Sequence, residues 1–233
     1  MENKIDLSIV IPSYLEEENL RILLPRINKS LSDIGISNEI LIIDTINPLD
    51  NTQLVCVDFN NVKYINRENG NKYGDAVRTG IKYAIGNRIL FMDADGSHSP
   101  EFIANLYEFR EGNDVVIASR FVEGGGSDNK KILILMSWTV NFIYSVLFNL
   151  KCKDVSNSFK LYNGELIKSI IINCDNFDVV EEILIKLKRN KKDLKLKEIP
   201  YMFKERMFGN TKRNLLAFVF SYIFTLIRLK FSK

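Results

Sequence analysis

The sequence predicts an α/β fold in which a mostly parallel central sheet is flanked by helices. Short apolar runs alternate with segments of helical periodicity, as in strands joined by helical crossovers. Several apolar runs end in a carboxylate, and in open α/β sheets ligands bind beyond the carboxyl ends of the strands. The 233 residues are enough to bury one full core.

The expected strands and helices alternate along the first half of the chain. Strands are expected over residues 7–12, 39–44, 62–65, 89–92 and 114–120. Helices are expected between Ser13 and residue 31, over residues 76–85 and from about residue 100 to 111. Pro12 stops the first strand because proline has no N–H to donate, and Ser13 is expected to cap the helix that follows. This alternation predicts a parallel sheet of the nucleotide-binding type.

The main candidate site lies at the end of the strand over residues 89–92. Asp93 and Asp95 follow this strand directly, and Gly96 begins a turn. Two carboxylates so close repel each other, and both stay ionised most easily when a cation lies between them. Oxygen ligands suit Mg²⁺ or Mn²⁺, which can also hold the phosphates of a nucleotide. The alternative is an ordinary solvated turn, because this spacing of aspartates is common by chance.

Charge is distributed unevenly along the chain. Residues 186–233 contain fourteen Lys and Arg against three acidic residues, a balance of +11. Because the whole chain carries +3, residues 1–185 carry −8. A basic end on an acidic body predicts an anionic partner, either a membrane surface or a nucleic acid, although a solvated helix face could supply part of the charge. Three scattered cysteines argue against a disulfide scaffold or a zinc site and fit a reducing cytosol.

Two uncharged apolar segments lie in the second half of the chain. Residues 132–150 include polar Ser137, Thr139 and Asn141, so we expect an amphipathic helix that packs on the domain and touches lipid on one side. An ordinary buried helix is the alternative. Residues 215–227 have basic flanks but are too few to span a bilayer, which takes about 20 residues. We expect this segment to lie in a membrane interface; docking on the first helix or a dimer contact are alternatives.

Five motifs occur in an order typical of one enzyme family: residues 9–14 with Glu16, Asp44, residues 74–80, residues 93–95 and residues 118–121. With them the chain resembles the inverting family 2 glycosyltransferases of GT-A fold. Further motifs resemble the branch with dolichyl-phosphate mannose synthase and related polyprenyl-phosphate hexose synthases: residues 95–100, 119–125, Asp154 with 159–162, and 199–212. The expected division is a GT-A domain over residues 1–205 and a basic, apolar segment over residues 206–233 for membrane contact or docking.

The resemblance implies how a nucleotide-sugar donor would bind. Tyr14 would stack on the base or ribose, unless it is only a packed turn residue, and Asp44 would accept a hydrogen bond from either. The full nucleotide-binding set would be Pro12, Tyr14, Glu16, Asp44 and Asp93. Asp93 and Asp95 would hold the Mg²⁺ or Mn²⁺ ion that bridges the donor diphosphate. Ser97 stands where many relatives have a glutamine that assists the metal.

The resemblance also implies an acceptor, a polyprenyl phosphate such as undecaprenyl or dolichyl phosphate. A phosphate is already an ionised nucleophile and needs no general base, but it needs cations to hold it. The acceptor-binding set would be Arg120, Ser137, Arg206 and Lys212. Simple surface charge is the alternative for Arg206 and Lys212. The catalytic set would be Asp93, Asp95, Arg120, Arg206 and Lys212.

We therefore expect an inverting enzyme that transfers a hexose from GDP-mannose or a UDP-hexose to a polyprenyl phosphate. It would lie peripherally on the cytoplasmic face of the membrane. One alternative is a family 2 enzyme that acts on a hydroxyl of a surface glycan, with Glu181 or Glu182 as the base or else as ordinary helix surface. Another is a non-catalytic membrane or nucleic-acid binding protein. We expect no nucleic-acid partner, because such proteins usually interleave aromatic residues along a basic groove.

Overall fold

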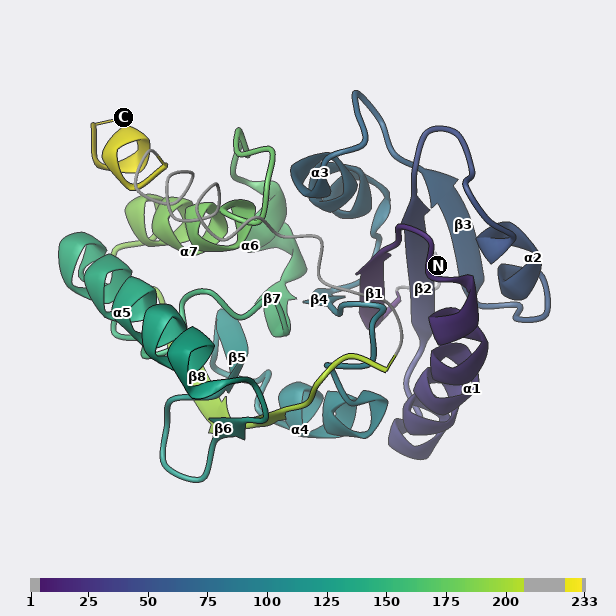
Figure 1. Ribbon diagram of the computed structural model, residues 1–233, viewed down its shortest axis with the longest axis horizontal. Helices are drawn as coiled ribbons and strands as arrows, with labels where there is room; N and C mark the ends of the chain where they lie inside the picture. Colours follow the sequence, from purple (N-terminus) through teal and green to yellow (C-terminus); the bar gives the residue numbers. More distant parts are fainter. Residues whose placement is uncertain (1–4, 208–224, 232–233) are drawn as a thin grey trace.

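Figure 1 shows the protein as a computed structural model that describes residues 5–207 and 225–231. Its centre is a seven-stranded sheet in the order β3-β2-β1-β4-β7-β5-β8. Strand β7 is antiparallel to its neighbours β4 and β5, and the other strands are parallel to one another. The strands are β1 (Leu7–Pro12), β2 (Asn38–Asp44), β3 (Val62–Asn66), β4 (Arg88–Phe91), β5 (Val115–Ser119), β7 (Lys160–Asn163) and β8 (Leu196–Pro200).

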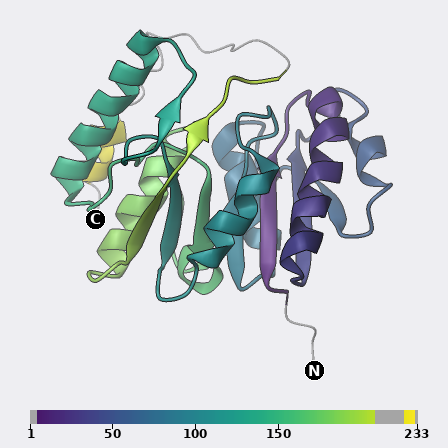
Figure 2. The same ribbon diagram turned by 90° about the horizontal axis from the view of Figure 1, so that it is seen from below.

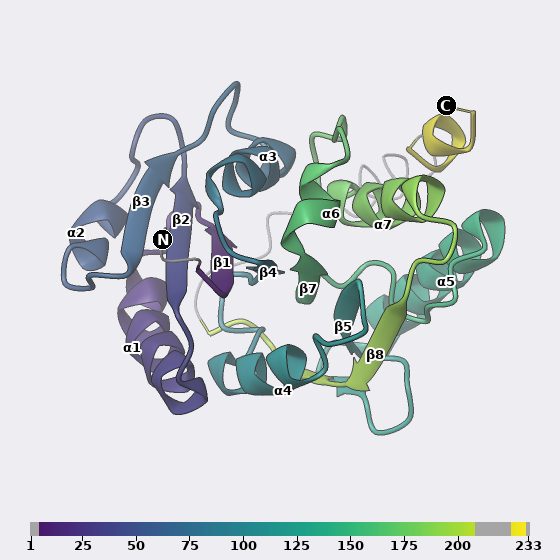
Figure 3. The same cartoon turned by 180° about the vertical axis from the view of Figure 1, so that it is seen from behind.

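Helices cover both faces of this sheet (Figures 1 and 3). One face packs against α1 (Glu17–Ile34), α2 (Thr52–Cys56) and α4 (Ile103–Glu108), and Figure 2 views the molecule from the side of α1 and α4. The other face packs against α3 (Tyr73–Tyr83), α6 (Gly164–Lys168) and α7 (Val179–Asn190). Each face carries its own apolar core, so the expected mostly parallel α/β sheet is confirmed.

Strand β1 is an interior strand of the sheet, between β2 and β4, and both of its faces are covered. All six of its residues are buried, as expected for a parallel strand covered on both sides. In the register, Ile9 lies opposite Ile40 of β2 and Leu90 of β4. The carboxyl ends of these three parallel strands therefore meet at one edge of the sheet, where Asp93 follows β4 closely.

Several predicted boundaries differ from the structure. Ser13 does not cap α1, whose N-cap is Glu16 without a side-chain hydrogen bond. Instead the Ser13 N–H donates to the Ile43 carbonyl at 2.9 Å, which continues the strand pairing past Pro12. Helix α3 begins at Tyr73 rather than at residue 76. The helix expected from residue 100 is a 3₁₀ turn, Pro100–Phe102, followed by α4, which ends at Glu108.

Helix α5 (Lys131–Phe148) is the expected uncharged helix, and it lies at the outer end of the sheet (Figure 1). Only Asn141 and Tyr144 of its residues are buried, so the alternative of an ordinary buried helix is wrong. Its length and apolar composition would suffice to cross a membrane. Its most exposed large side chains are Ile132, Leu135, Trp138, Phe142 and Val146.

The end of the chain returns to the domain. Residues 225–231 are helical, and Leu229 is buried in the same core cluster as α7. The Thr225 hydroxyl donates to the Asp178 carboxylate, and the Arg228 guanidinium lies 2.6 Å from the Cys174 sulfur. This part of the C-terminal segment therefore docks on the domain. Residues 215–224, which hold most of the second apolar segment, lie outside the described residues.

A short two-stranded ribbon joins distant parts of the chain. Strand β6 (Gly126–Ser127) pairs in parallel with β9 (Met202–Phe203). Because β9 follows β8 directly, the ribbon helps to position the backbone of residues 201–207, which we call the strap. Figure 2 shows this segment running from β8 past the end of the sheet.

Candidate active site

Asp93 is surrounded by hydrogen-bond donors at the end of β4. Its Oδ1 accepts from the Tyr73 hydroxyl at 3.3 Å, and its Oδ2 accepts from the Ser158 hydroxyl at 3.0 Å. These donors come from the start of α3 and from the loop before β7. The side chain is 27% exposed, so the carboxylate is oriented by the protein and still open to a ligand.

Asp95 is more deeply buried and carries a second set of partners. Its Oδ1 accepts from the Ser97 N–H at 3.0 Å and from the Ser97 hydroxyl at 2.6 Å. Its Oδ2 lies 2.7 Å from the Arg206 guanidinium. Burial alone would raise the pKa of the Asp95 carboxyl, but the Ser97 hydrogen bonds and nearby positive charge hold it below its ordinary value. Asp95 is therefore an ionised carboxylate.

The strap crosses the turn that carries both aspartates and brings Arg206 to it. The Tyr201 hydroxyl donates to the Ser97 carbonyl at 2.7 Å and accepts from the Ser99 N–H at 2.7 Å. The Met207 N–H donates to the Asp95 carbonyl at 2.8 Å. Gly96 has φ +83°, and a Cβ there would lie 2.5 Å from the Met207 side chain. Gly96 thus permits both the turn and the close passage of the strap.

Glu16 adds a third acidic group near this turn. Burial raises the pKa of Glu16 to about 7; a hydrogen bond from Asn19, 2.6 Å long, opposes the rise, and the charges of Asp95 and Asp93 add to it. The preceding residue, Leu15, has φ +59°, a left-handed backbone that non-glycine residues rarely adopt. Such strain is often concentrated at functional sites.

Among the other residues predicted to bind nucleotide, Asp44 is buried and already hydrogen-bonded. It accepts from the Thr45 N–H and from the Tyr64 hydroxyl, each at 2.8 Å, and is 1% exposed. Pro12 ends β1, and Tyr14 is 46% exposed in the loop between β1 and α1. Their roles toward a nucleotide stay predictions.

The residues predicted to bind the acceptor lie in different places. Arg120 forms a two-pronged ion pair with fully buried Asp154, at 2.7 and 2.8 Å. Its guanidinium also lies 5.6 Å from the centre of the Phe203 ring, at the start of the strap. Ser137 is half-buried on α5. Lys212 lies outside the described residues, so of this set Arg206 is the one that the structure brings against the aspartates.

The two glutamates considered as general bases are buried on the inner side of α7. Glu181 is 0% exposed and Glu182 is 1% exposed. Glu182 accepts backbone N–H groups of Asn173 and Cys174 and pairs with Lys186 at 2.8 Å. Their reading as ordinary helix surface is therefore wrong, and their burial also argues against a role as base toward an external acceptor.

Sequence reasoning missed the residues that orient the aspartates. Tyr73 and Ser158 each donate to Asp93, and His98, quoted only as part of a motif, accepts a backbone hydrogen bond from it. Arg67 was also missed. Its buried guanidinium donates to the Ser13 and Asn71 carbonyls, and these hydrogen bonds fix the loop after β1. Ser158 directly precedes the motif at residues 159–162 but was not part of it.

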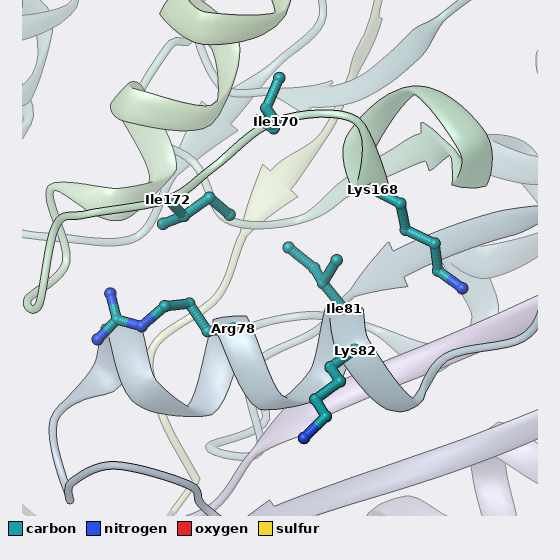
Figure 4. A pocket seen from close by; sticks show the side chains of 6 residues that line it. All are labelled: Arg78, Ile81, Lys82, Lys168, Ile170 and Ile172. Carbon is teal, nitrogen blue, oxygen red and sulfur yellow. The ribbon is translucent and has the colours of Figure 1, made fainter.

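A separate hollow of about 310 Å³ lies beside α3 and α6 (Figure 4). It is lined by Arg78, Ile81, Lys82, Lys168, Ile170 and Ile172, and the three basic side chains point away from one another. Each of these cations is already engaged: Arg78 with Asp75, Lys82 with Glu68, and Lys168 with the Ala84 carbonyl. The hollow shares no lining residue with the aspartate turn, so we do not place the active site there.

The aspartate turn fits a divalent ion that is only partly held by protein. Within residues 5–207 and 225–231, no group of three or more His, Cys, Asp or Glu side chains could hold a metal ion. Mg²⁺, however, typically binds through one or two carboxylates and completes its shell with water and substrate phosphates. Asp93 and Asp95 supply such a pair of carboxylates at the edge of the sheet where ligands bind.

Comparison with known proteins identifies the family to which the chain belongs. Residues 8–171 match the family model described as glycosyl transferase family 2. The chain is 33% identical over 213 residues to a dolichol-phosphate mannosyltransferase of Pyrococcus furiosus, a match that covers 88% of this chain and 58% of that protein. It is 27% identical over 215 residues to a polyprenol monophosphomannose synthase of Mycolicibacterium smegmatis, covering 88% of this chain and 79% of that one.

Solved structures agree on the fold. A glucosyl-3-phosphoglycerate synthase from Mycobacterium tuberculosis, crystallised with Mn²⁺, uridine diphosphate and phosphoglyceric acid, superposes with a TM-score of 0.73. The superposition covers 98% of this chain and 80% of that one at 18% identity. The GT-A fold expected from the sequence is confirmed, and the chain belongs to glycosyl transferase family 2.

Proposed function

We propose that the protein transfers a hexose from a nucleotide sugar to a polyprenyl phosphate at a membrane surface, with inversion at the anomeric carbon. The observation that carries this proposal is the turn after β4, which holds Asp93 and Asp95 and where the Arg206 cation lies against Asp95. The cluster offers carboxylates for a metal-bound diphosphate and a cation for a second phosphate. Relatives named as mannosyltransferases make mannose the first sugar to test.

On the donor side, Asp93 and Asp95 would hold Mg²⁺ or Mn²⁺. Bound there, the ion would neutralise the diphosphate and stabilise it as the leaving group. Tyr73, Ser158 and Ser97 orient the two carboxylates by their hydrogen bonds. Glu16, with its pKa near neutral pH, can keep its proton and donate a hydrogen bond to the donor instead of adding negative charge.

The nucleoside would lie beyond β1 and β2. Tyr14 would offer its half-exposed ring to the base or ribose. Pro12 and Asp44 would form the floor of this part of the site, and the buried Arg67 would keep the loop after β1 in place. The direction of the parallel strands supports this placement, because ligands of open α/β sheets bind at the carboxyl ends of the strands.

On the acceptor side, an oxygen of the lipid phosphate would attack the anomeric carbon as the bond to the diphosphate breaks. No proton has to be removed from an ionised phosphate, which suits a site whose candidate bases, Glu181 and Glu182, are buried. Arg206 would hold the phosphate with Arg120 and Lys212, and Ser137 would add a hydroxyl. The side chain of Arg206 is 36% exposed and can change partner more easily than Arg120, whose side chain is 12% exposed.

The membrane contact would be made by α5 and the basic C-terminal region. The exposed apolar side chains of α5 suit insertion into the headgroup region of a bilayer. The excess of Lys and Arg over residues 186–233 would attract the anionic cytoplasmic leaflet. We therefore place the protein peripherally on the cytoplasmic face.

The test is a donor screen in detergent with undecaprenyl and dolichyl phosphate. GDP-mannose, UDP-glucose, UDP-galactose and UDP-N-acetylglucosamine would each be offered with Mn²⁺ and with EDTA, and lipid-linked sugar would be counted. Metal-dependent transfer to lipid from one donor is the expected result. Metal-dependent donor hydrolysis without lipid product would overturn the acceptor assignment, and absence of any metal-dependent reaction would overturn the proposal as a whole.

A further inference from the structure

His98 is completely buried against the aspartate turn. It is 0% exposed, and its ring stacks on Phe159 with 4.5 Å between ring centres and 8° between planes. The Phe203 ring meets it edge-on at 5.7 Å. These two aromatic contacts fix the plane of the imidazole, so its nitrogens point in defined directions.

One of these nitrogens reveals the tautomer. The backbone N–H of Asp93 donates to His98 Nδ1 at 2.9 Å, so Nδ1 must be an acceptor without a proton. Because Nδ1 accepts this hydrogen bond, the ring cannot be the doubly protonated imidazolium and is neutral. A neutral imidazole with an unprotonated Nδ1 carries its proton on Nε2.

The other nitrogen, Nε2, is a buried donor that lacks an acceptor at hydrogen-bonding distance in the described part of the chain. It lies 3.8 Å from Asp93 Oδ2. The Asn157 side chain also interacts with the ring, but its oxygen lies outside hydrogen-bonding geometry to Nε2. Its amide N–H donates to the Ala118 carbonyl at 2.5 Å, and its oxygen accepts from the Phe159 N–H at 3.3 Å. A buried donor without a partner is costly, so a small movement of the Asp93 carboxylate toward it would be favourable.

We infer that His98 is a positioning residue for Asp93. Its Nδ1 holds the backbone of Asp93, and its Nε2 proton holds the Asp93 carboxylate in the metal-binding conformation. The gap from 3.8 Å to an ordinary hydrogen bond is about 1 Å, a movement open to a side chain that is 27% exposed. Hydrogen bonds of this kind behind a metal ligand fix its orientation. The inference rests on the proposed metal site and not on the identity of sugar or lipid.

The same geometry explains why a histidine suits this position. A phenylalanine could stack on Phe159 equally well but would leave the Asp93 N–H buried without an acceptor. An imidazole supplies an acceptor to the backbone and a donor to the carboxylate from opposite sides of one rigid ring. One side chain can therefore fix both ends of the same aspartate.

Nuclear magnetic resonance tests the inference directly, because His98 is the only histidine in the chain. In tag-free protein labelled with ¹⁵N-histidine, we expect the neutral tautomer with the proton on Nε2. On addition of Mg²⁺ with GDP or UDP, the Nε2 proton resonance should move downfield, and this movement should be lost in Asp93→Asn. A proton on Nδ1, or a resonance that Mg²⁺ leaves in place, would overturn the inference.

Substitutions give a second readout that does not depend on transfer activity. His98→Asn keeps an acceptor near Nδ1, whereas His98→Gln can reach the carboxylate with its amide N–H. We expect Mn²⁺ affinity, measured by electron paramagnetic resonance with GDP or UDP, to fall about 10- to 100-fold in His98→Asn and to be largely restored in His98→Gln. Phe102→Leu, which removes aromatic contacts with Phe159 and Tyr201 but none with His98, serves as the packing control and should bind Mn²⁺ like the wild type.

The outcomes separate this inference from the proposed function. If the wild type binds Mn²⁺ and His98→Asn does not, but no lipid-linked sugar forms, the inference holds and the acceptor assignment fails. If His98→Asn binds Mn²⁺ as tightly as the wild type, or no more weakly than Phe102→Leu, the positioning role is wrong. A wild type that binds no Mn²⁺ would overturn both.

Discussion

The Arg206 guanidinium lies 2.7 Å from the Asp95 carboxylate, on the side opposite the Ser97 hydrogen bonds. The strap that carries Arg206 is fixed to the turn by the Tyr201 hydroxyl and the Met207 N–H. A cation of the chain itself therefore occupies one oxygen of a proposed metal ligand. Arg206 would have to leave Asp95 as a divalent ion arrives, which would free it for the acceptor phosphate.

Replacing Arg206 should consequently strengthen metal binding while it weakens acceptor binding. In Arg206→Gln, we expect Mn²⁺ affinity to rise about 3- to 10-fold, because a competing partly exposed positive charge is removed. The KM for the lipid phosphate should rise about tenfold or more through the loss of a charge-assisted contact. Lys29→Gln, which removes an exposed ion pair with Asp33, is the matched control. Unchanged or weaker Mn²⁺ binding in Arg206→Gln would contradict the competition.

Asp95→Asn should abolish transfer without unfolding the protein. The amide oxygen can still accept from Ser97, but it lacks the charge that a divalent ion and Arg206 require. We expect the rate to fall about 10³-fold or more, as with the loss of other strong electrostatic contacts to a leaving group. Circular dichroism should show the wild-type spectrum. Asp33→Asn, at the exposed end of α1, is the control. A fully active Asp95→Asn variant would show that Asp95 does not act as a metal ligand.

Glu16 should make stability depend on pH in the absence of metal. The pKa of Glu16 is about 7 in the folded protein against an ordinary value of about 4.5, so the folded state binds this proton more tightly. The contribution of Glu16 to the free energy of unfolding is therefore complete below about pH 4.5 and is lost as pH rises through about 7. In EDTA, Glu16→Gln should match the wild type near pH 5 and melt about 2–4 °C higher at pH 7.5.

The matched control for this prediction is Glu18→Gln, an exposed neighbour on α1. The melting temperatures of both variants and the wild type would be measured from pH 5 to pH 7.5. An equal difference between Glu16→Gln and the wild type at every pH would show that Glu16 does not titrate in this range.

Trp138 should report membrane contact directly. It is the only tryptophan in the chain, it is 50% exposed, and it stacks on Phe142 along the outer side of α5. With anionic vesicles its emission should shift to shorter wavelength, because the indole would leave water for the headgroup region. Phe142→Asp places a charge beside it on an exposed position and should prevent the shift. An emission spectrum that vesicles do not change would argue against α5 as the contact.

The same experiment is cleaner than deleting the C-terminal segment. Removal of residues 215–233 would take away Leu229, which is buried in the core, and the contact of Thr225 with Asp178. Release from vesicles could then reflect a damaged domain. Phe142→Asp leaves these contacts in place.

The sequence was sufficient for strands β1, β2, β3, β4 and β5 and for the aspartate turn, but β8, which pairs in parallel with β5, was not predicted. Strands β1, β2 and β4 are continuous apolar runs because helices cover both of their faces, and such runs are easily recognised. Strand β7 was not predicted because it is short and begins with Lys160, a residue normally found at surfaces. The structure buries Lys160 completely, and its ammonium donates to the carbonyls of Val155 and Asn157.

Two contacts of the site could not be predicted from the sequence, for one physical reason. Ser158 reaches Asp93 because β7 runs antiparallel to β4, so the beginning of β7 lies beside the end of β4. Arg206 reaches Asp95 because hydrogen bonds between the strap and the turn place it there. Both contacts join residues far apart in the chain, and local periodicity carries no information about such pairings.

The antiparallel insertion of β7 also determines when the site can form during synthesis. When the first half of the chain has emerged from the ribosome, β1, β2, β3 and β4 are available and can pair with one another. At that stage β4 is an uncovered sheet edge, and such edges readily pair with other chains. Only when β7 and the strap have emerged do Ser158 and Arg206 join the aspartates. A nascent chain would therefore gain its ability to hold a donor late, when β7 covers the exposed edge of β4.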